Sequence, residues 1–171
     1  NVRTSKSKTA GGEAAAYAEA LVPRPLYLAQ FAEWMRVQGA LAGERPAAAR
    51  HLKVLGSAVR RFLPTYQNLR PDLDYKSRLV IDHGAISLDV SQLSEGERGV
   101  LALVLDLARR LSQANPSLND PLNEGEATVL IDAIDLPLHP KWQRTTLQHL
   151  ATLLPGCQFI ATTHSPQIVA A

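Results

Sequence analysis

Residues 129–135 read Val-Leu-Ile-Asp-Ala-Ile-Asp, and residues 159–166 read Phe-Ile-Ala-Thr-Thr-His-Ser-Pro. Each stretch is an apolar run followed by polar residues, a pattern typical of a buried strand in a parallel sheet. A helical pattern lies between the two strands, which we predict at 127–132 and 157–162. We therefore expect a βαβ unit with a right-handed crossover, whose strand ends meet at the sheet edge where ligands bind.

Polar residues with useful chemistry follow both predicted strands. Asp132 ends the first strand and is placed to hold Mg²⁺, chiefly through water. The next residue, Ala133, has no side-chain oxygen, so it could not orient a water molecule for attack on a phosphate. His164 lies in a strand-to-helix loop, where an imidazole can hydrogen-bond a γ-phosphate. Taken alone, each pattern also fits a plain core strand ending in a solvated aspartate, or a structural loop histidine.

A third motif, Leu-Ser-Glu-Gly-Glu-Arg at residues 93–98, precedes a long helical pattern. Ser94 is a good N-cap, and Glu97 completes a capping box, which is a sufficient structural account. The free N–H groups of the helix start, the Ser94 hydroxyl and the Gly96 backbone would also form an anion site suited to the γ-phosphate of ATP. The order of the three motifs favours an ATP site over chance.

Periodicity predicts the other elements. Two apolar stripes predict antiparallel helices joined by residues 42–45, and a switch to alternation predicts a β-hairpin. The predicted elements are helical stripes at Leu28, Phe31, Met35 and Leu41 and at Leu52, Leu55, Val59 and Phe62, strands at 79–82 and 86–90 joined by His83-Gly84, a helix over 95–113, a loop over 113–126 and a helix from Pro140 to Leu154.

Composition limits the class of protein. The chain has 171 residues, of which 46% are apolar, enough for one packed domain. The net charge of +2 is too weak to indicate nucleic-acid binding, and Arg60-Arg61 and Arg109-Arg110 fit solvated helix faces. The single cysteine, Cys157, excludes an internal disulfide and fits a reducing cytosol. With no apolar run of roughly 20 residues, no signal peptide and no initial methionine, we expect a fragment of a longer cytoplasmic protein.

Together these motifs resemble an ABC-type ATPase of the RecF/SMC/OLD-like branch. The resemblance covers residues 26–171 and is closest to the AAA family ATPases of Septu-type and retron-linked bacterial antiphage defence. Its strongest cues are residues 132–143, Asp-Ala-Ile-Asp-Leu-Pro-Leu-His-Pro-Lys-Trp-Gln, and residues 162–168. The family usually reads D-E-I-D-L-H-L-H-P-K-W-Q, so Ala133 replaces the catalytic glutamate and Pro137 replaces the first histidine. Because the flanking residues keep the pattern of active members, we favour an introduced substitution at 133 over a natural one.

The resemblance implies an α/β fold: the C-terminal half of a P-loop ABC-type ATPase domain, with a partly parallel sheet, flanking helices and a preceding α-helical insertion. It divides the chain into a disordered or linker end at 1–25, the helical insertion at 26–64 and the ATPase lobe at 65–171. The implied cofactors are ATP and Mg²⁺. No phosphate loop of the form G-x-x-x-x-G-K-S/T, the Walker A motif, occurs in the 171 residues.

The resemblance also assigns roles to individual residues. Asp132 would hold the metal, Ala133 marks the catalytic glutamate position, and His164 would be the γ-phosphate switch. The residues that would contact nucleotide across a head-to-tail dimer are Ser94, Glu95, Gly96, Glu97 and Asp135.

The implied function is an ATPase subunit that dimerises on ATP-Mg²⁺ and controls an effector nuclease or toxin in antiphage defence. A reverse transcriptase with its RNA or DNA is a further expected partner, and no membrane is expected to be involved. This chain itself is expected to be deficient in hydrolysis. Two alternatives remain open at this point: a non-hydrolysing, ATP-gated structural clamp, and a DNA-repair ATPase that acts on DNA.

Overall fold

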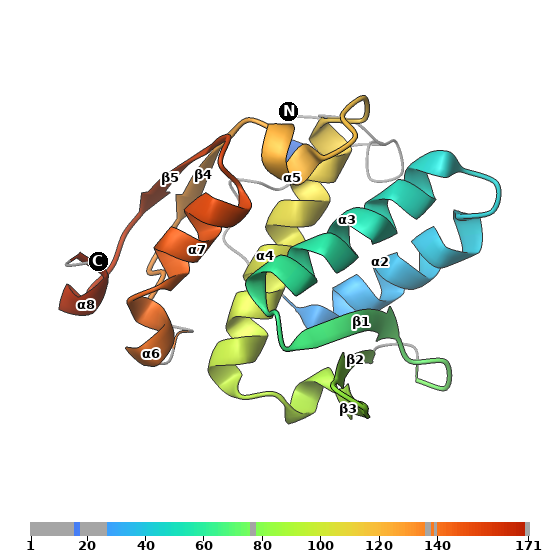
Figure 1. Ribbon diagram of the computed structural model, residues 1–171, viewed down its shortest axis with the longest axis horizontal. Coiled ribbons are helices and arrows are strands. Elements are labelled where there is room, and N and C mark those ends of the chain that lie inside the picture. Colours follow the sequence, from blue (N-terminus) through green and yellow to red (C-terminus); the bar gives the residue numbers. More distant parts are fainter. Residues whose placement is uncertain (1–15, 18–26, 76–77, 136–137, 139, 170–171) are drawn as a thin grey trace, which may run out of the picture.

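A computed structural model of the chain describes residues 16–17, 27–75, 78–135, 138 and 140–169. The long helices lie between two small sheets, one antiparallel and one parallel, which confirms the predicted α/β class (Figure 1). The expected linker end at 1–25, apart from residues 16–17, and the departure at Pro137 lie outside the described residues. The elements are α2 (Leu28–Leu41), α3 (Pro46–Phe62), β1 (Tyr66–Pro71), β2 (Leu79–His83), β3 (Ile86–Asp89), the 3₁₀ helix η1 (Val90–Gln92), α4 (Glu95–Ala114), α5 (Pro121–Glu124), β4 (Ala127–Ile131), α6 (Pro140–Gln143), α7 (Thr146–Leu153), β5 (Cys157–Ala161) and α8 (Pro166–Val169).

The predicted helix pair is confirmed as α2 and α3, which lie side by side and are joined by a short loop (Figure 1). Pro46 occupies the first turn of α3, where its missing N–H costs nothing. The helix ends at Phe62, two residues before Pro64, which cannot continue it. Helix α3 packs against α2 on one side and α4 on the other, and so lies at the centre of the helical layer.

The antiparallel sheet has the strand order β1-β2-β3, one strand more than we predicted. Its hairpin pairs His83 with Ile86, so the two-residue loop is Gly84-Ala85 instead of the predicted His83-Gly84. Gly84 has a φ of +61°, a conformation that glycine adopts without strain, which explains why it takes the first loop position. Strand β1 pairs with β2 through a bulge between Gln67 and Arg70.

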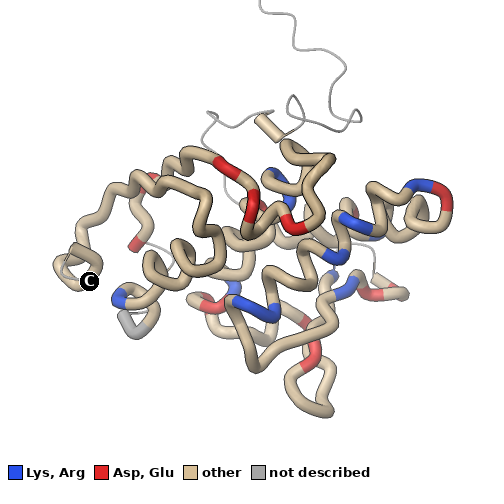
Figure 2. Tube along the Cα trace, turned by 45° about the horizontal axis from the view of Figure 1, so that its top comes forward, with Lys and Arg blue, Asp and Glu red and all other residues tan. Residues whose placement is uncertain are grey.

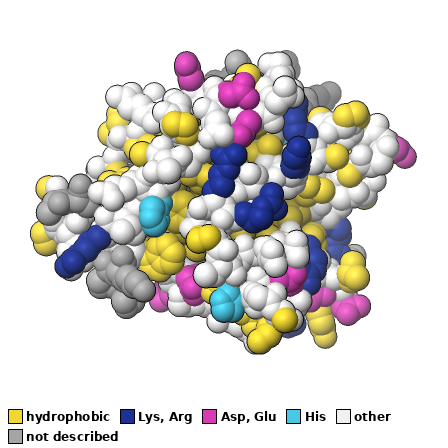
Figure 3. All heavy atoms as spheres, viewed as in Figure 1, with side chains coloured by type: hydrophobic (Ala, Val, Ile, Leu, Met, Phe, Trp, Pro, Cys, Tyr) yellow, Lys and Arg dark blue, Asp and Glu magenta, His cyan; other side chains and the backbone are white. Residues whose placement is uncertain are grey.

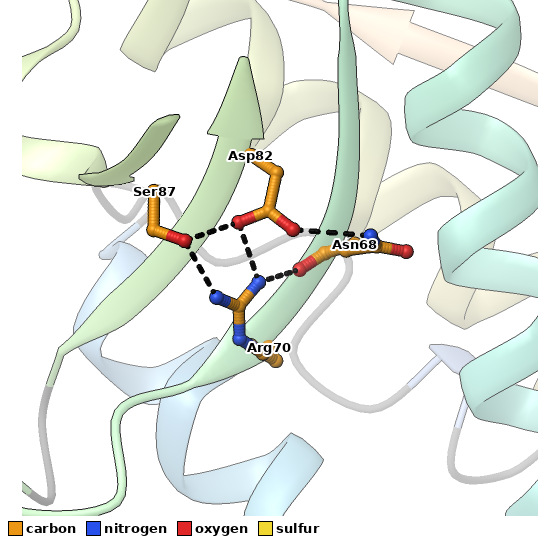
Figure 4. Close-up of polar contacts among 4 residues, drawn as sticks. All are labelled: Asn68, Arg70, Asp82 and Ser87. Atoms are coloured by element: carbon orange, nitrogen blue, oxygen red, sulfur yellow. Dashed lines mark hydrogen bonds and ion pairs between the residues drawn. The ribbon is translucent and has the colours of Figure 1, made fainter. Parts of the chain in front are cut away.

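A polar cluster ties the three strands together on the exposed side of this sheet (Figure 4). The Asp82 carboxylate accepts hydrogen bonds from Ser87 Oγ (2.7 Å), Asn68 Nδ2 (3.0 Å) and Arg70 Nη1 (2.9 Å). Arg70 also donates to Ser87 Oγ at 3.0 Å and to the Asn68 carbonyl at 2.8 Å. The hydrogen bond from Ser87, followed by those from Asn68 and Arg70, lowers the pKa of Asp82 to about 2, so the cluster keeps its charge down to strongly acidic pH.

The parallel pair β4-β5 confirms the predicted βαβ arrangement, with Leu130 directly beside Ile160. However, our expectation of two buried strands is wrong for one face of this sheet. Leu130 is 64% exposed and Ile160 is 52% exposed, whereas Val129 on the opposite face is 9% exposed. One face therefore packs on the helical layer, and the other has no cover among the described residues.

The connection between β4 and β5 also differs from the prediction of one helix from Pro140 to Leu154. It consists of α6 and α7, interrupted at residues 144–145. At the break the Thr146 hydroxyl donates to the Trp142 carbonyl at 2.6 Å, and the Thr145 N–H donates to the same oxygen at 3.2 Å. Such side-chain bonds compete with the regular helical pattern. The predicted loop at 113–126 contains one further helical turn, α5.

One continuous hydrophobic core holds these elements together. It runs from α2 and α3 through β2 and α4 to α7 and α8. Its largest fully buried side chains include Leu55, Ile81, Leu101, Leu105 and Leu150. Helix α4 lies along the middle of the molecule in Figure 1, with its first turn beside the antiparallel sheet. Since α3 packs directly on α4, the position of the helix pair is coupled to that of the motif at the start of α4.

Candidate functional site

The loop after β4 carries the first group of predicted site residues. Asp132 is exposed at the carboxyl end of the strand, as the sequence predicts. Its Oδ1 atom accepts a hydrogen bond from the Thr162 hydroxyl at 2.6 Å, and the Thr162 oxygen in turn accepts the Ala133 N–H at 2.8 Å. Thr162 follows β5, so this threonine joins the two strand ends and fixes the direction of the Asp132 carboxylate.

Ala133 has an unusual backbone conformation. Its φ is +50°, in the left-handed region that residues with a Cβ avoid. The Ile134 N–H donates to the Thr162 carbonyl at 3.0 Å, and the Thr162 N–H donates to the Ile131 carbonyl at 3.0 Å. These bonds hold the strained residue in place. Backbone strain of this kind gathers at functional sites, where the surrounding structure over-determines it.

The loop after β5 is tied to the same edge through Asp135. The Asp135 Oδ1 atom accepts the Thr163 hydroxyl at 2.7 Å and the His164 N–H at 3.1 Å. The Thr163 hydroxyl bond lowers the pKa of the Asp135 carboxyl, with a further contribution from the His164 N–H. Asp135 is therefore a charged brace within its own chain, and the His164 backbone is fixed while its side chain remains exposed.

Two further residues hold this edge from the α6 side. The Ser165 hydroxyl donates to Gln143 Oε1 at 2.7 Å, and Gln143 Nε2 donates to the carbonyls of Leu138 (3.0 Å) and Asp135 (3.3 Å). Gln143 ends the Pro-Lys-Trp-Gln segment of α6. The α6 segment thus connects the loop after β4 with the loop after β5, and the His164 loop cannot shift without disturbing Asp135.

The motif at the start of α4 forms the predicted capping box. The Glu97 N–H donates to Ser94 Oγ at 3.3 Å, and Glu97 Oε2 accepts the Ser94 N–H at 3.0 Å. The Ser94 hydroxyl itself donates to Glu97 Oε2 at 2.7 Å. Ser94 and Glu95 are exposed and Glu97 is half-buried, whereas Gly96 is buried, so of these four predicted phosphate contacts Gly96 does not face solvent.

Glu97 also meets a residue that sequence reasoning missed. Tyr66, at the start of β1, donates its hydroxyl to Glu97 Oε1 at 3.0 Å. Partial burial raises the pKa of Glu97, but the hydrogen bonds from Ser94 and Tyr66 and the nearby His83 outweigh it, so the pKa lies below its ordinary value. Glu97 therefore carries a full negative charge at neutral pH.

The structure brings together one group of predicted residues and leaves the other apart. Asp132, Ala133, Asp135 and His164 share the carboxyl edge of β4 and β5 through Thr162 and Thr163. Among the described residues, no hydrogen bond joins them to Ser94, Glu95, Gly96 or Glu97. In Figure 1 the start of α4 lies beside the antiparallel sheet, while β4 and β5 lie at the opposite side of α4. The chain thus presents two separate polar surfaces.

The possible metal ligands of the described residues suit Mg²⁺ only when a bound nucleotide supplies the other ligands. Across the described part of the chain, no cluster of three or more His, Cys, Asp or Glu side chains could hold a metal ion. Mg²⁺ keeps several waters and is commonly held by one or two carboxylates together with substrate phosphates. Asp132, which has one oxygen engaged by Thr162 and is otherwise exposed, fits that role.

Three arginines of the two predicted arginine pairs form ion pairs with acidic residues of the chain. Arg109 and Arg110 both pair with the buried Asp106, at 2.6 and 2.8 Å, and Arg61 pairs with Asp120 at 2.9 Å. Figure 2 shows the acidic and basic residues in separate groups along the trace, and α3 carries Lys and Arg but no Asp or Glu. Figure 3 shows Lys and Arg side chains gathered over this helix. None of the described helices is long and apolar enough to cross a membrane.

Comparisons with known proteins show which families and proteins the chain is similar to. A family described as "AAA domain, putative AbiEii toxin, Type IV TA system" matches residues 24–170. The chain is 46% identical over 120 residues to the Retron Ec83 probable ATPase of Escherichia coli, an alignment that covers 68% of this chain and 21% of the relative. It is 42% identical over 130 residues to the Retron Vc95 probable ATPase of Vibrio cholerae serotype O1 biovar El Tor, covering 74% of this chain and 24% of the relative.

Shorter or weaker similarities extend the set. The chain is 50% identical over 46 residues to the Septu protein PtuA of Bacillus thuringiensis, covering 27% of this chain and 12% of that protein. A solved structure described as "Structural biochemistry of ATP-driven dimerization and DNA stimulated activation of SMC ATPases" is 16% identical, with a TM-score of 0.49 over 69% of each chain. The chain spans about a fifth to a quarter of the length of the two retron relatives.

Proposed function

Because the chain belongs to the AAA domain family that matches residues 24–170, we propose that it supplies part of the nucleotide site of a bacterial antiphage-defence ATPase. The protein would bind ATP-Mg²⁺, dimerise head to tail on it, and use the nucleotide state to control an effector. The relatives named as retron ATPases and Septu proteins support the defence role. The effector class, a nuclease or toxin, the association with a reverse transcriptase and its RNA or DNA, and a cytoplasmic location belong to the same proposal.

The observation that carries this proposal is the braced edge of β4 and β5. Asp132, the strained Ala133 and His164 are held there by Thr162, Thr163 and Asp135, at the end of the sheet where α/β proteins bind ligands. One face of the sheet beside this edge has no cover from the part of the chain that the structure describes, although parallel strands are ordinarily covered on both faces. Both facts support a site that another polypeptide segment completes with a phosphate loop.

Each residue has a defined task in the proposed site. Asp132 would hold the metal of a bound nucleotide, and His164 would contact the γ-phosphate from its fixed loop. Ser94 and the start of α4 would meet the nucleotide carried by a second copy, a role consistent with their separation from Asp132 within one chain. The positive end of the α4 dipole favours an anion at that position.

The residue at position 133 decides between two forms of this proposal, a hydrolysing ATPase and a non-hydrolysing clamp. A carboxylate at 133 would accept a proton from the attacking water, whereas the methyl group of alanine cannot. The chain as it stands would therefore bind and clamp ATP with little turnover. The absence of this one group is the reason to retain the non-hydrolysing clamp as the second candidate.

Restoring a glutamate at position 133 tests the proposal. The host is an exchange protein in which this chain replaces the similar segment of the Escherichia coli relative. Ala133→Glu should raise ATP hydrolysis by about 10²–10⁴-fold, the usual contribution of a positioned general base, with little change in ATP affinity. Phosphate release and ATP binding by calorimetry measure the two quantities.

Ala151→Glu is the matched control, because Ala151 is exposed on α7 and the substitution adds the same carboxylate away from the edge. It should leave turnover at the level of the unsubstituted exchange protein. Equally slow hydrolysis by the unsubstituted protein and by the Ala133→Glu and Ala151→Glu variants, with tight ATP binding, would identify the clamp as the function. Equally fast hydrolysis by all three would show that Ala133 does not occupy the catalytic position. Absence of ATP binding in the exchange protein, together with binding by the intact relative, would overturn the nucleotide site itself.

A further inference from the structure

Tyr66 joins the helix pair to the start of α4. It begins β1 immediately after α3, where its N–H donates to the Leu63 carbonyl at 2.9 Å, and it pairs with His83 of β2. The Tyr66 and His83 rings lie 5.1 Å apart. The phenol is thus held by both the turn after α3 and the antiparallel sheet, while its hydroxyl reaches across to Glu97.

The Glu97 carboxylate accepts three hydrogen bonds, two at Oε2 and one at Oε1. Oε2 accepts both the N–H and the hydroxyl of Ser94, and Oε1 accepts Tyr66 Oη. Burial of the phenol, followed by the hydrogen bond to and charge of Glu97, raises the pKa of Tyr66. Tyr66 therefore keeps its proton and remains a donor at every physiological pH.

The hydrogen bond to Glu97 limits what the Ser94 hydroxyl can bind. Its hydroxyl has one proton, which points to Glu97, so it cannot at the same time donate to a phosphate. Turning the hydroxyl outward leaves Glu97 Oε2 with only the Ser94 N–H. A carboxylate released at that moment would lie at the positive end of α4 and compete there with the incoming anion. The Tyr66 hydroxyl is the donor that does not depend on Ser94.

We propose that Tyr66 is a positioning residue for the Ser94 loop: it holds Glu97 beside α4 while the Ser94 hydroxyl turns to the γ-phosphate of a nucleotide carried by a second copy. This inference rests on the function proposed above. It predicts that nucleotide-dependent association requires a hydroxyl at position 66 even though that hydroxyl never touches the nucleotide.

The test removes one oxygen atom with Tyr66→Phe. In the 171-residue chain, carboxyl NMR titration should show the Glu97 pKa rising toward its ordinary value, and amide exchange at Ser94 should become faster. In the exchange protein, sedimentation with ATP-Mg²⁺ should show association weakened by about tenfold, the effect of one lost hydrogen bond to a charged group. The melting temperature should fall only slightly with Tyr66→Phe, because one hydrogen bond is lost while the packing of the ring is retained.

Tyr75→Phe is the matched control. Tyr75 is 55% exposed and its ring contacts the Arg78 guanidinium at 4.2 Å, so losing its hydroxyl should change neither Glu97 nor association. An unchanged Glu97 pKa and unchanged association in Tyr66→Phe would overturn the positioning role. If the exchange protein with Tyr66 intact does not associate on ATP, the proposed function fails and the role in nucleotide binding fails with it, while the NMR titration still decides whether Tyr66 holds Glu97.

Discussion

At the scale of single residues, position 133 combines a chemical loss with a conformational demand. The missing carboxylate lowers the expected rate of ATP hydrolysis. The φ of +50° lowers the stability of the folded state, because an alanine Cβ is strained in the left-handed region. The strain is held by the hydrogen bonds of Thr162 and Ile134. None of these hydrogen bonds uses the side chain of residue 133. Any residue with a Cβ would therefore be strained at this position, including the glutamate expected in active relatives.

Ala133→Gly should therefore stabilise the chain by about 0.5–1 kcal/mol, because glycine adopts this conformation freely. Urea unfolding measures the change. Ala49→Gly, at an exposed position inside α3, should destabilise by about the same amount, since glycine weakens a helix interior. Loss of stability in both variants would show that residue 133 is not left-handed in solution.

His51 gives a pH dependence of known sign. Its Nδ1 atom lies 2.6 Å from the hydroxyl of the fully buried Ser112, between α3 and α4. Burial, followed by the charge of Arg50, lowers the His51 pKa below 6.5. The folded state thus binds a proton less readily than the unfolded state, so stability is fully present above pH 6.5 and is lost as the pH falls through the folded pKa.

The urea midpoint should consequently fall between about pH 7.5 and about pH 5.5, the range around the ordinary histidine pKa, and His51→Gln should flatten this part of the profile. His149→Gln, which replaces an exposed imidazole on α7, should leave the fall unchanged. A profile that is equally steep with glutamine at position 51 would assign the pH dependence to another group.

At the scale of elements, α4 connects the helix pair with the motif at its own first turn. Its N-terminus is defined by Ser94 and Glu97, and its C-terminus by Asn115 and Pro116, so both ends are set by local chemistry. The predicted and observed bounds of this helix agree closely for that reason. Changes at Ser94 should act on association much more than on folding.

Ser94→Arg should abolish ATP-dependent dimerisation of the exchange protein while lowering stability by only about 0.5–2 kcal/mol, the cost of a lost cap. The added side chain would fill the space that a second copy's phosphate requires. Sedimentation with ATP and a melting curve measure the two effects. Ser117→Arg, at the exposed loop beyond the opposite end of α4, should still dimerise; a dimer that persists with arginine at 94 would leave Ser94 with a capping role alone.

Elements set by distant contacts could not be predicted from the sequence. Strand β1 was missed because Asn68, with a φ of +52°, and a bulge interrupt its alternation. Tyr66 and Glu97 are 31 positions apart, and nothing local in the chain indicates their hydrogen bond. The pattern alone placed Asp132 at the end of one strand and His164 in the loop after the next, and the structure has both residues there. Asp135 was named only from the family resemblance, and the hydrogen bonds of Thr162 and Thr163 at this edge are recognised only in three dimensions.

At the scale of the whole molecule, the sheet formed by β4 and β5 has one packed face and one face that the described residues leave uncovered. Val129 is 9% exposed, while the adjacent Leu130 is 64% exposed and is level with the exposed Ile160. We predicted buried strands because a continuous apolar run indicates them. The described residues cover one face, so we attribute the apolar residues of the other face to the assembled sheet that we propose.

Leu130→Ala should consequently cost less than about 0.5 kcal/mol in the 171-residue chain, but about 2–5 kcal/mol in the exchange protein, where we expect the residue to be covered. Val129→Ala is the matched control and should cost roughly 1–3 kcal/mol in both. Urea unfolding measures all four values. The same small cost for Leu130→Ala in both proteins would show that this face remains open after assembly.

The bare sheet face also has a consequence for biosynthesis. The helices that form most of the core precede β4 along the chain, so on the ribosome they emerge first and can pack before the last strands appear. β4 and β5 then present adjacent apolar side chains at Leu130 and Ile160 to the surrounding water, and exposed apolar strands of this kind promote aggregation. The polypeptide segment that we propose covers this face would therefore have to reach it soon after synthesis to keep the two strands from aggregating.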